Sequence, residues 1–173
     1  MTIETIFFVI LALTAIASAI LLVTRVNPMH SALLLIVNFV ALAGVYLTLH
    51  AQFVAIMQVL VYAGAIMVLV LFVIMLRNLQ DEARRHDKRA WRQYSGAGLA
   101  VAVLAVLIPL LGGSGSFTTE ALARAHPDPA ALGTVENIGA VLFRDFLFPF
   151  EMASLLLLAA IVGAVVLAKK RFP

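Results

Sequence analysis

Five apolar runs separated by polar connections organise this chain. A helix of about 20 apolar residues crosses the roughly 30 Å hydrocarbon core of a bilayer, and each run is long enough to do so. We therefore predict an all-α, polytopic membrane protein with five transmembrane helices that form a single membrane domain over residues 1–173. The predicted spans are residues 3–23, 31–49, 53–76, 95–111 and 148–168.

The connections differ in length and character. Proline disfavours helix at the preceding residue and suits a first helical turn, so Asn27-Pro28 predicts a tight connection after the first span. Only residues 50–52 separate the second and third spans, which predicts antiparallel neighbours whose small faces meet. The fourth and fifth spans are joined by residues 112–146. In that loop, residues 135–146 show apolar side chains at helical spacing and predict a short amphipathic helix.

Positive charge is distributed unevenly between the connections. Ten of the 12 Lys and Arg residues follow the first, third and fifth spans. These ten are Arg25, six residues within the basic loop 77–92, and Lys169, Lys170 and Arg171. Because Lys and Arg mark cytoplasmic connections, we predict an outside N-terminus, a cytoplasmic C-terminus, an inner loop at 77–92 and an outer loop at 112–146.

Composition supports a membrane protein and excludes several chemistries. Hydrophobic residues make up 64% of the chain and charged residues 12%, whereas a soluble domain has about 25% charged residues. The chain has no cysteine, which excludes disulfides and thiolate metal sites. Its basic residues flank apolar spans, so the net charge of +3 indicates membrane topology and no nucleic-acid partner. No nucleophile elbow, phosphate loop or dinucleotide fingerprint occurs, and we expect no catalytic residue in this chain alone.

The third span, residues 53–76, contains polar and small residues that lipid anchoring does not require. In a straight α-helix one stripe of this span mixes both kinds: Ala55, Gln58, Tyr62, Ala65 and Leu69. Gly64 stands between Ala63 and Ala65 and permits two structures. Small residues allow another helix backbone to approach closely. Alternatively, glycine loosens the helix and lets a π-bulge form, which rotates the half beyond it by about 100°.

Two more polar residues leave alternatives open. Asn38, near the middle of the second span, suits either a hydrogen bond between helices or a water-lined path. Glu151, in the first turns of the fifth span, is either a helix-dipole partner at the headgroups or an ionisable group in a proton path.

Two blocks of the sequence, Val26–Leu76 and Ile138–Lys170, closely resemble subunit J of NADH:quinone oxidoreductase, respiratory complex I. The most specific part is VYAGAIMVLVLFVIML, Val61–Leu76, together with the Asn-Pro connection before the second span. The resemblance implies a non-catalytic subunit in a hetero-oligomer with other membrane-arm subunits, in the bacterial cell inner membrane. It also implies that FMN, iron-sulfur clusters and a quinone belong to other subunits, with no cofactor or metal bound by this chain.

The resemblance further implies a π-bulge in the third helix at Tyr62, Ala63 and Gly64. Conversion between bulged and straight forms would be linked to a hydrated path from the quinone site toward the antiporter-like subunits. Rotation of Val68, Leu69 and their neighbours would open or close a water wire in this path.

The predicted polar lining of that path consists of Asn38, Gln58, Tyr62 and Glu151. Members of the family that this chain resembles can carry a glutamate where this chain has Gln58, which cannot titrate but can hydrogen-bond to water. Two alternatives to the complex I subunit stay open: a small homo-oligomeric channel or transporter, and a purely structural scaffold. The sequence shows no pair of similar halves, which disfavours an independent transporter.

Overall fold

The computed structural model describes residues 3–25, 27–76, 98, 100–106, 108 and 132–169, which are helical apart from short turns and contain no strand. The all-α class is therefore confirmed for this part of the chain. The first two helices are α1 (Ile3–Thr24) and α2 (Pro28–Thr48). The third is continuous and consists of α3 (Gln52–Met57), the π-helix η1 (Gln58–Ile66) and α4 (Met67–Leu76). A short helix, α7 (Val135–Arg144), precedes the long α8 (Leu147–Ala168).

Four helices of the described chain are long and apolar enough to cross a membrane: α1, α2, Gln52–Leu76 and α8. They begin and end within three residues of four of the predicted spans. The largest difference is at α2, which begins at Pro28 because the Asn27 side chain caps it, accepting a hydrogen bond from the Met29 N–H at 2.9 Å. Only residues 98, 100–106 and 108 of the predicted span 95–111 are described, and the basic loop 77–92 lies outside the described residues, so the five-span count remains a prediction.

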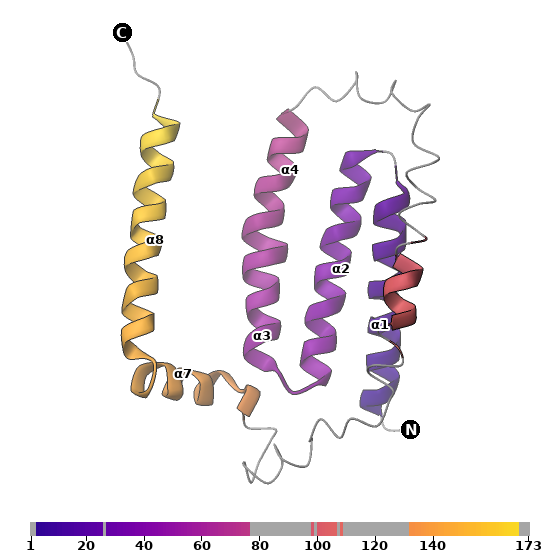
Figure 1. Ribbon diagram of the computed structural model, residues 1–173, viewed down its shortest axis with the longest axis horizontal. Helices are drawn as coiled ribbons and strands as arrows, with labels where there is room; N and C mark the ends of the chain where they lie inside the picture. Colours follow the sequence, from indigo (N-terminus) through magenta and orange to yellow (C-terminus); the bar gives the residue numbers. More distant parts are fainter. Residues whose placement is uncertain are drawn as a thin grey trace.

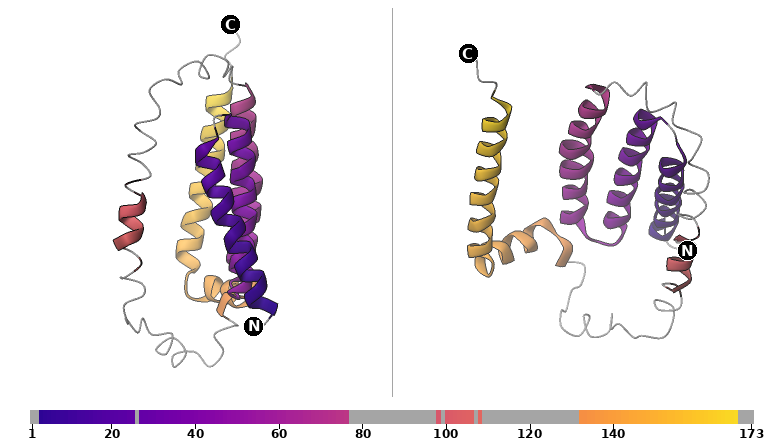
Figure 2. Two further views of the ribbon diagram at one scale, coloured as in Figure 1. Left: turned by 90° about the vertical axis from the view of Figure 1, so that its right-hand side faces the viewer. Right: turned by 45° about the horizontal axis from the view of Figure 1, so that its top comes forward.

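The long helices stand in a single layer (Figure 1). Helices α1, α2 and α3–η1–α4 lie side by side, and these three overlap in the view turned by 90° (Figure 2). Helix α8 stands apart from them, and α7 lies between the N-terminal end of α8 and the end where α2 turns into α3 (Figure 1). The C-terminal ends of α1, α4 and α8 lie at the opposite end (Figure 1). Arg25 and Lys169, which follow α1 and α8, therefore share one end of the molecule.

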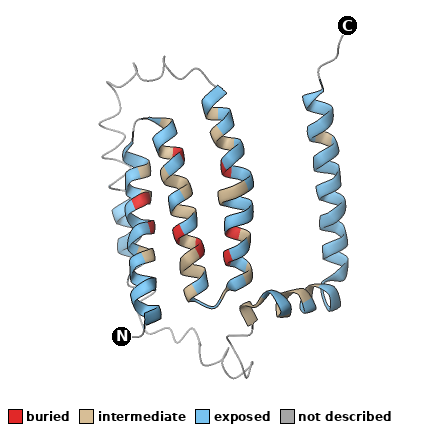
Figure 3. Cartoon of the chain, turned by 180° about the vertical axis from the view of Figure 1, so that it is seen from behind, coloured by how far each residue is buried: buried red, intermediate tan, exposed pale blue. Residues whose placement is uncertain are grey.

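Among the described residues, burial is confined to a few that are mostly small (Figure 3). The buried apolar residues are Ala15, Ala32, Ala41, Ala43, Ala55 and Met67. Membrane helices have no hydrophobic drive toward one another, so alanine-lined surfaces gain contact by close approach. The second and third helices do pack together, as predicted. Gly44, however, faces α1, because a Cβ there would lie 2.8 Å from the Leu11 Cδ1 atom.

Helix α7 forms where the sequence predicts an amphipathic helix. The Thr134 hydroxyl accepts a hydrogen bond from the Asn137 N–H at 3.3 Å and caps its first turn. Glu136 in the first turn and Arg144 in the last complement the helix dipole. At its C-terminal end, Phe143 meets Phe150 of α8 edge to face, with ring centroids 5.1 Å apart. This pair holds the corner between α7 and α8.

Candidate functional site

The centre of the third membrane helix is a π-helix of nine residues, Gln58–Ile66. It includes Tyr62, Ala63 and Gly64, the three residues at which a π-bulge is predicted. The Met67 N–H donates to the Tyr62 carbonyl, five residues earlier, as in a π-helix. Most π-helical segments in proteins are single-turn bulges. The segment here is longer than the predicted one-turn bulge.

The π-helix decides which residues of the third helix are buried. Gln58 is 9% exposed and Met67 only 2%, although they are nine residues apart. In an α-helix nine residues turn through about 900°, which would put these side chains on opposite faces. A π-helix takes about one residue more per turn, so nine residues complete about two full turns. Gln58 and Met67 therefore share a face.

This geometry changes the stripe expected for a straight helix. Ala55 and Gln58 are buried as neighbours at i and i+3, but Ala65 is exposed and Leu69 is 64% exposed. The two added residues of η1 rotate the chain beyond it, so Met67 takes the position that Ala65 would have in an α-helix. Val68 and Leu69 face away from the buried side.

Gly64 is tightly placed inside η1. A Cβ at this position would lie 3.2 Å from the Val59 carbonyl oxygen, five residues earlier. That is shorter than an ordinary van der Waals contact, so a side chain would push on the turn that defines the π-helix. Of the two alternatives for Gly64, close approach of another helix backbone is not seen among the described residues, and Gly64 lies instead within the π-helix.

Tyr62 and Gln58 are the polar side chains of η1. Tyr62 is 47% exposed, and its ring tilts against Phe39 of α2 with centroids 5.6 Å apart, a contact worth about 0.5–1.5 kcal/mol. Gln58 is 9% exposed, and no hydrogen bond joins its side-chain amide to any residue in the described part of the chain. No fully buried side-chain nitrogen or oxygen in that part lacks a partner, so the Gln58 amide reaches the surface and can bond to water or to another molecule.

Asn38 lies on the other side of α2, toward α1. Its Nδ2 donates to the Ala15 carbonyl at 2.7 Å and to the Ser18 hydroxyl at 3.1 Å. The Ser18 hydroxyl itself donates to the Ala15 carbonyl at 2.9 Å. Asn38 thus makes the hydrogen bond between helices that was one of its two predicted roles. Ser18, which is buried, was missed because nothing in the sequence pairs it with a residue 20 positions away.

The structure does not gather all four predicted lining residues. Gln58 and Tyr62 share η1, whereas Asn38 points to α1. Glu151 is exposed on α8, one turn from its N-terminus, and its backbone carbonyl accepts a hydrogen bond from the Ser154 hydroxyl at 2.7 Å. Phe39, which meets Tyr62, was not among the predicted site residues. Roles of all these residues in a proton path remain predictions.

Comparison with known proteins assigns a family to this arrangement. The family model of NADH-ubiquinone/plastoquinone oxidoreductase chain 6 matches residues 18–167. NAD(P)H-quinone oxidoreductase chain 6 of Leptolyngbya boryana is 43% identical over 98% of this chain and 82% of its own length. NADH-quinone oxidoreductase subunit J of Rhodobacter capsulatus is 33% identical over 96% and 82%. F(420)H(2) dehydrogenase subunit J of Methanosarcina mazei is 34% identical over 96% and 91%.

Proposed function

This chain belongs to the NADH-ubiquinone/plastoquinone oxidoreductase chain 6 family, and on that basis we propose that it couples quinone reduction to proton translocation in a respiratory complex I. Its part is a switchable third membrane helix beside a hydrated path. The observation that carries this proposal is the shared face of Gln58 and Met67, which exists only while η1 is π-helical.

The proposed movement follows from the helix geometry. Straightening η1 into an α-helix would turn α4 by about 180° relative to α3, since nine α-helical residues end on the opposite face. Met67 would leave the surface of α2, and Leu69 would approach it. Met67 suits such a change because a thioether chain fills irregular spaces without a fixed shape. Val68 and Leu69, now exposed, would then alternate between the inside and the outside of the layer.

The polar groups of η1 would bind water molecules of the hydrated path. The unpaired amide of Gln58 and the half-exposed Tyr62 lie on η1 itself, so a change of its register moves both groups and alters the water they hold. Asn38 and Glu151 would extend the polar path from α2 and α8. Glutamine holds and orients water without carrying a proton, so in this chain Gln58 would act as a hydrogen-bonding group.

The redox chemistry is assigned to other subunits. The relatives are named for different electron donors, NAD(P)H, NADH and F(420)H(2), although all align with nearly the whole of this chain. A subunit common to all three would not bind the donor. We propose a non-catalytic chain without a bound cofactor, with FMN, iron-sulfur clusters and the quinone site held by partner subunits of the hetero-oligomer.

For the membrane arrangement we propose five spans in a bacterial inner membrane, with the N-terminus outside and the C-terminus in the cytoplasm. The common end shared by Arg25 and Lys169 supports it, because both then lie on the cytoplasmic side.

Native electrophoresis of solubilised membranes tests the assignment. A tagged copy of the full chain is expected in a very large assembly that oxidises NADH in the gel. Migration as a small homo-oligomer, without redox subunits, would overturn the proposal and favour a channel formed by this chain alone.

Tyr62→Phe is expected to cause a mild loss. The Phe39 contact is kept because the ring remains, but one hydroxyl that can hold water is removed. We expect the number of protons pumped per electron pair to fall while the assembled enzyme stays at its normal level. The ratio is measured in closed vesicles, and a value equal to wild type would show that the hydroxyl is dispensable.

A further inference from the structure

The first residues before α7 touch the turn between α2 and α3. A Cβ at Gly133 would collide with the His50 carbonyl oxygen and would lie 2.9 Å from the Ala51 Cα atom. Only glycine allows the two backbones to approach so closely. His50 has a φ of 60°, a left-handed conformation that non-glycine residues adopt uncommonly. The turn is thus in an unusual conformation at the point where Gly133 packs against it.

This contact lies at the origin of the third helix. The Ala51 carbonyl accepts a hydrogen bond from the Ala55 N–H at 3.0 Å, within the first turn of α3. The Ala51 N–H in turn donates to the Tyr46 carbonyl of α2 at 3.0 Å. Ala55 and Gln58 are then buried, so the N-terminal part of this helix is held along its length. Gly133 adds a backbone contact to His50 and Ala51 from outside the α2–α3 hairpin.

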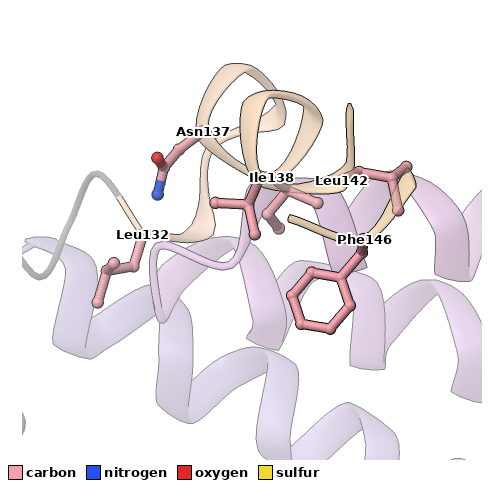
Figure 4. Close-up of a pocket in the computed structure, with 6 residues that line it drawn as sticks. Leu132, Asn137, Ile138, Leu142 and Phe146 are labelled. Atoms are coloured by element: carbon pink, nitrogen blue, oxygen red, sulfur yellow. The ribbon is translucent and has the colours of Figure 1, made fainter. Parts of the chain in front are cut away.

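The other end of α7 is tied to α8 by Phe143 and Phe150. Between these two ties, the apolar side of α7 lines a pocket of about 290 Å³ (Figure 4). The Leu132 and Phe146 side chains lie on the same side of α7, at opposite ends of this pocket (Figure 4). Helix α7 therefore connects the N-terminal end of α8 with Ala51, whose carbonyl accepts the first hydrogen bond of α3.

The C-terminal part of the third helix is much less constrained within this chain. Met67 is the one buried residue of α4, and Leu76 at its end is 83% exposed. The two halves that flank η1 therefore differ: α3 is held at its first turn and along one face, and α4 is held at its first residue.

We propose that α7 is a clamp on the α2–α3 turn, which fixes the start of the third helix so that a change of register in η1 turns α4 and leaves α3 in place. The inference rests on the proposed function for the change of register, but the clamp itself is a physical contact with its own test. Gly133 acts here as a positioning residue, through the His50-Ala51 backbone.

Amide hydrogen exchange in the assembled enzyme tests the clamp by comparing two glycine-to-alanine variants in one segment of the chain. Gly133→Ala adds a methyl group against the turn, whereas Gly139→Ala adds one to α7 where nothing lies within 4 Å. We expect Gly133→Ala to raise the exchange rate of amides at 49–55 about tenfold by local opening of the turn. Gly139→Ala should leave these rates at the wild-type value. Equal rates in Gly133→Ala and wild type would overturn the clamp.

Two further outcomes keep the clamp separate from the proposed function. If exchange rises in Gly133→Ala while Gly64→Val leaves coupled turnover unchanged, the clamp stands and the switch fails. If exchange is unchanged while Gly64→Val slows turnover, the clamp fails and the switch stands. Should Gly133→Ala prevent assembly, Leu132→Ala loosens the same end of α7 without adding an atom. It is expected to raise exchange at 49–55 about threefold, and no rise would count against the clamp.

Discussion

Gly64→Val is expected to lower coupled quinone reduction and proton pumping about tenfold while the enzyme remains assembled. The valine Cβ would meet the Val59 carbonyl oxygen at 3.2 Å in the π-helix, and its two methyl groups restrict the side chain further. A penalty of about 1.4 kcal/mol on the π-helical form changes the ratio of the two forms tenfold. Turnover that requires both forms slows accordingly. The measurements are quinone-dependent NADH oxidation and proton uptake in membrane vesicles.

Two controls make the Gly64 result specific. Gly139→Val places the same side chain in α7, where an added Cβ meets nothing within 4 Å, and should retain full turnover. Electron transfer from NADH to a soluble artificial acceptor should be unaffected in both variants, since the proposed function assigns the redox groups to other subunits. Normal coupled rates in intact Gly64→Val enzyme would refute the switch role of η1.

Asn38→Asp is expected to reduce the amount of assembled enzyme by at least about tenfold. The change conserves shape but replaces the NH₂ group that donates to both the Ala15 carbonyl and the Ser18 hydroxyl. A carboxylate there would face a carbonyl oxygen, and an aspartate at mid-membrane costs about 2.5–3.5 kcal/mol. A protonated aspartate would still offer one donor where Asn38 has two. The quantity to measure is the band of intact enzyme on native gels at equal expression.

Asn27→Asp is the matched control for this prediction. The same substitution at the α2 N-cap keeps an oxygen that accepts from the Met29 N–H, and a negative charge suits a helix N-terminus. Assembly of this variant should be normal. If Asn38→Asp assembled equally well, the hydrogen bonds between α1 and α2 would contribute little to the enzyme.

The sequence indicates the membrane helices well and their contacts poorly. Long apolar runs define spans by length alone, which is why four helices begin and end near their predicted positions. The start of α2 differs because the cap at Asn27 and the proline after it extend the helix toward its N-terminus. The pairing of Asn38 with Ser18 depends on the angle and register at which α1 and α2 cross, which a single sequence does not reveal.

The third helix shows the same limit at the candidate site. A glycine between two alanines indicates a weak point in the helix, and the resemblance to subunit J indicates a π-bulge. Neither indicates a π-helix of nine residues, which is seen only in the folded chain, together with the burial of Gln58 and Met67 on one face. The low exposure of Gln58 also follows from packing and not from local pattern. The proton-path roles depend further on chains that surround this one.

No residue of α8 is buried within the chain. The side chains of α8 are therefore constrained mainly by contacts with other proteins or with lipid. Ala55 and Met67, in contrast, are buried within their own chain. Second-site mutations that compensate for defects in α8 are therefore expected in the genes of partner subunits. Coevolution between this chain and those subunits should be concentrated along α8.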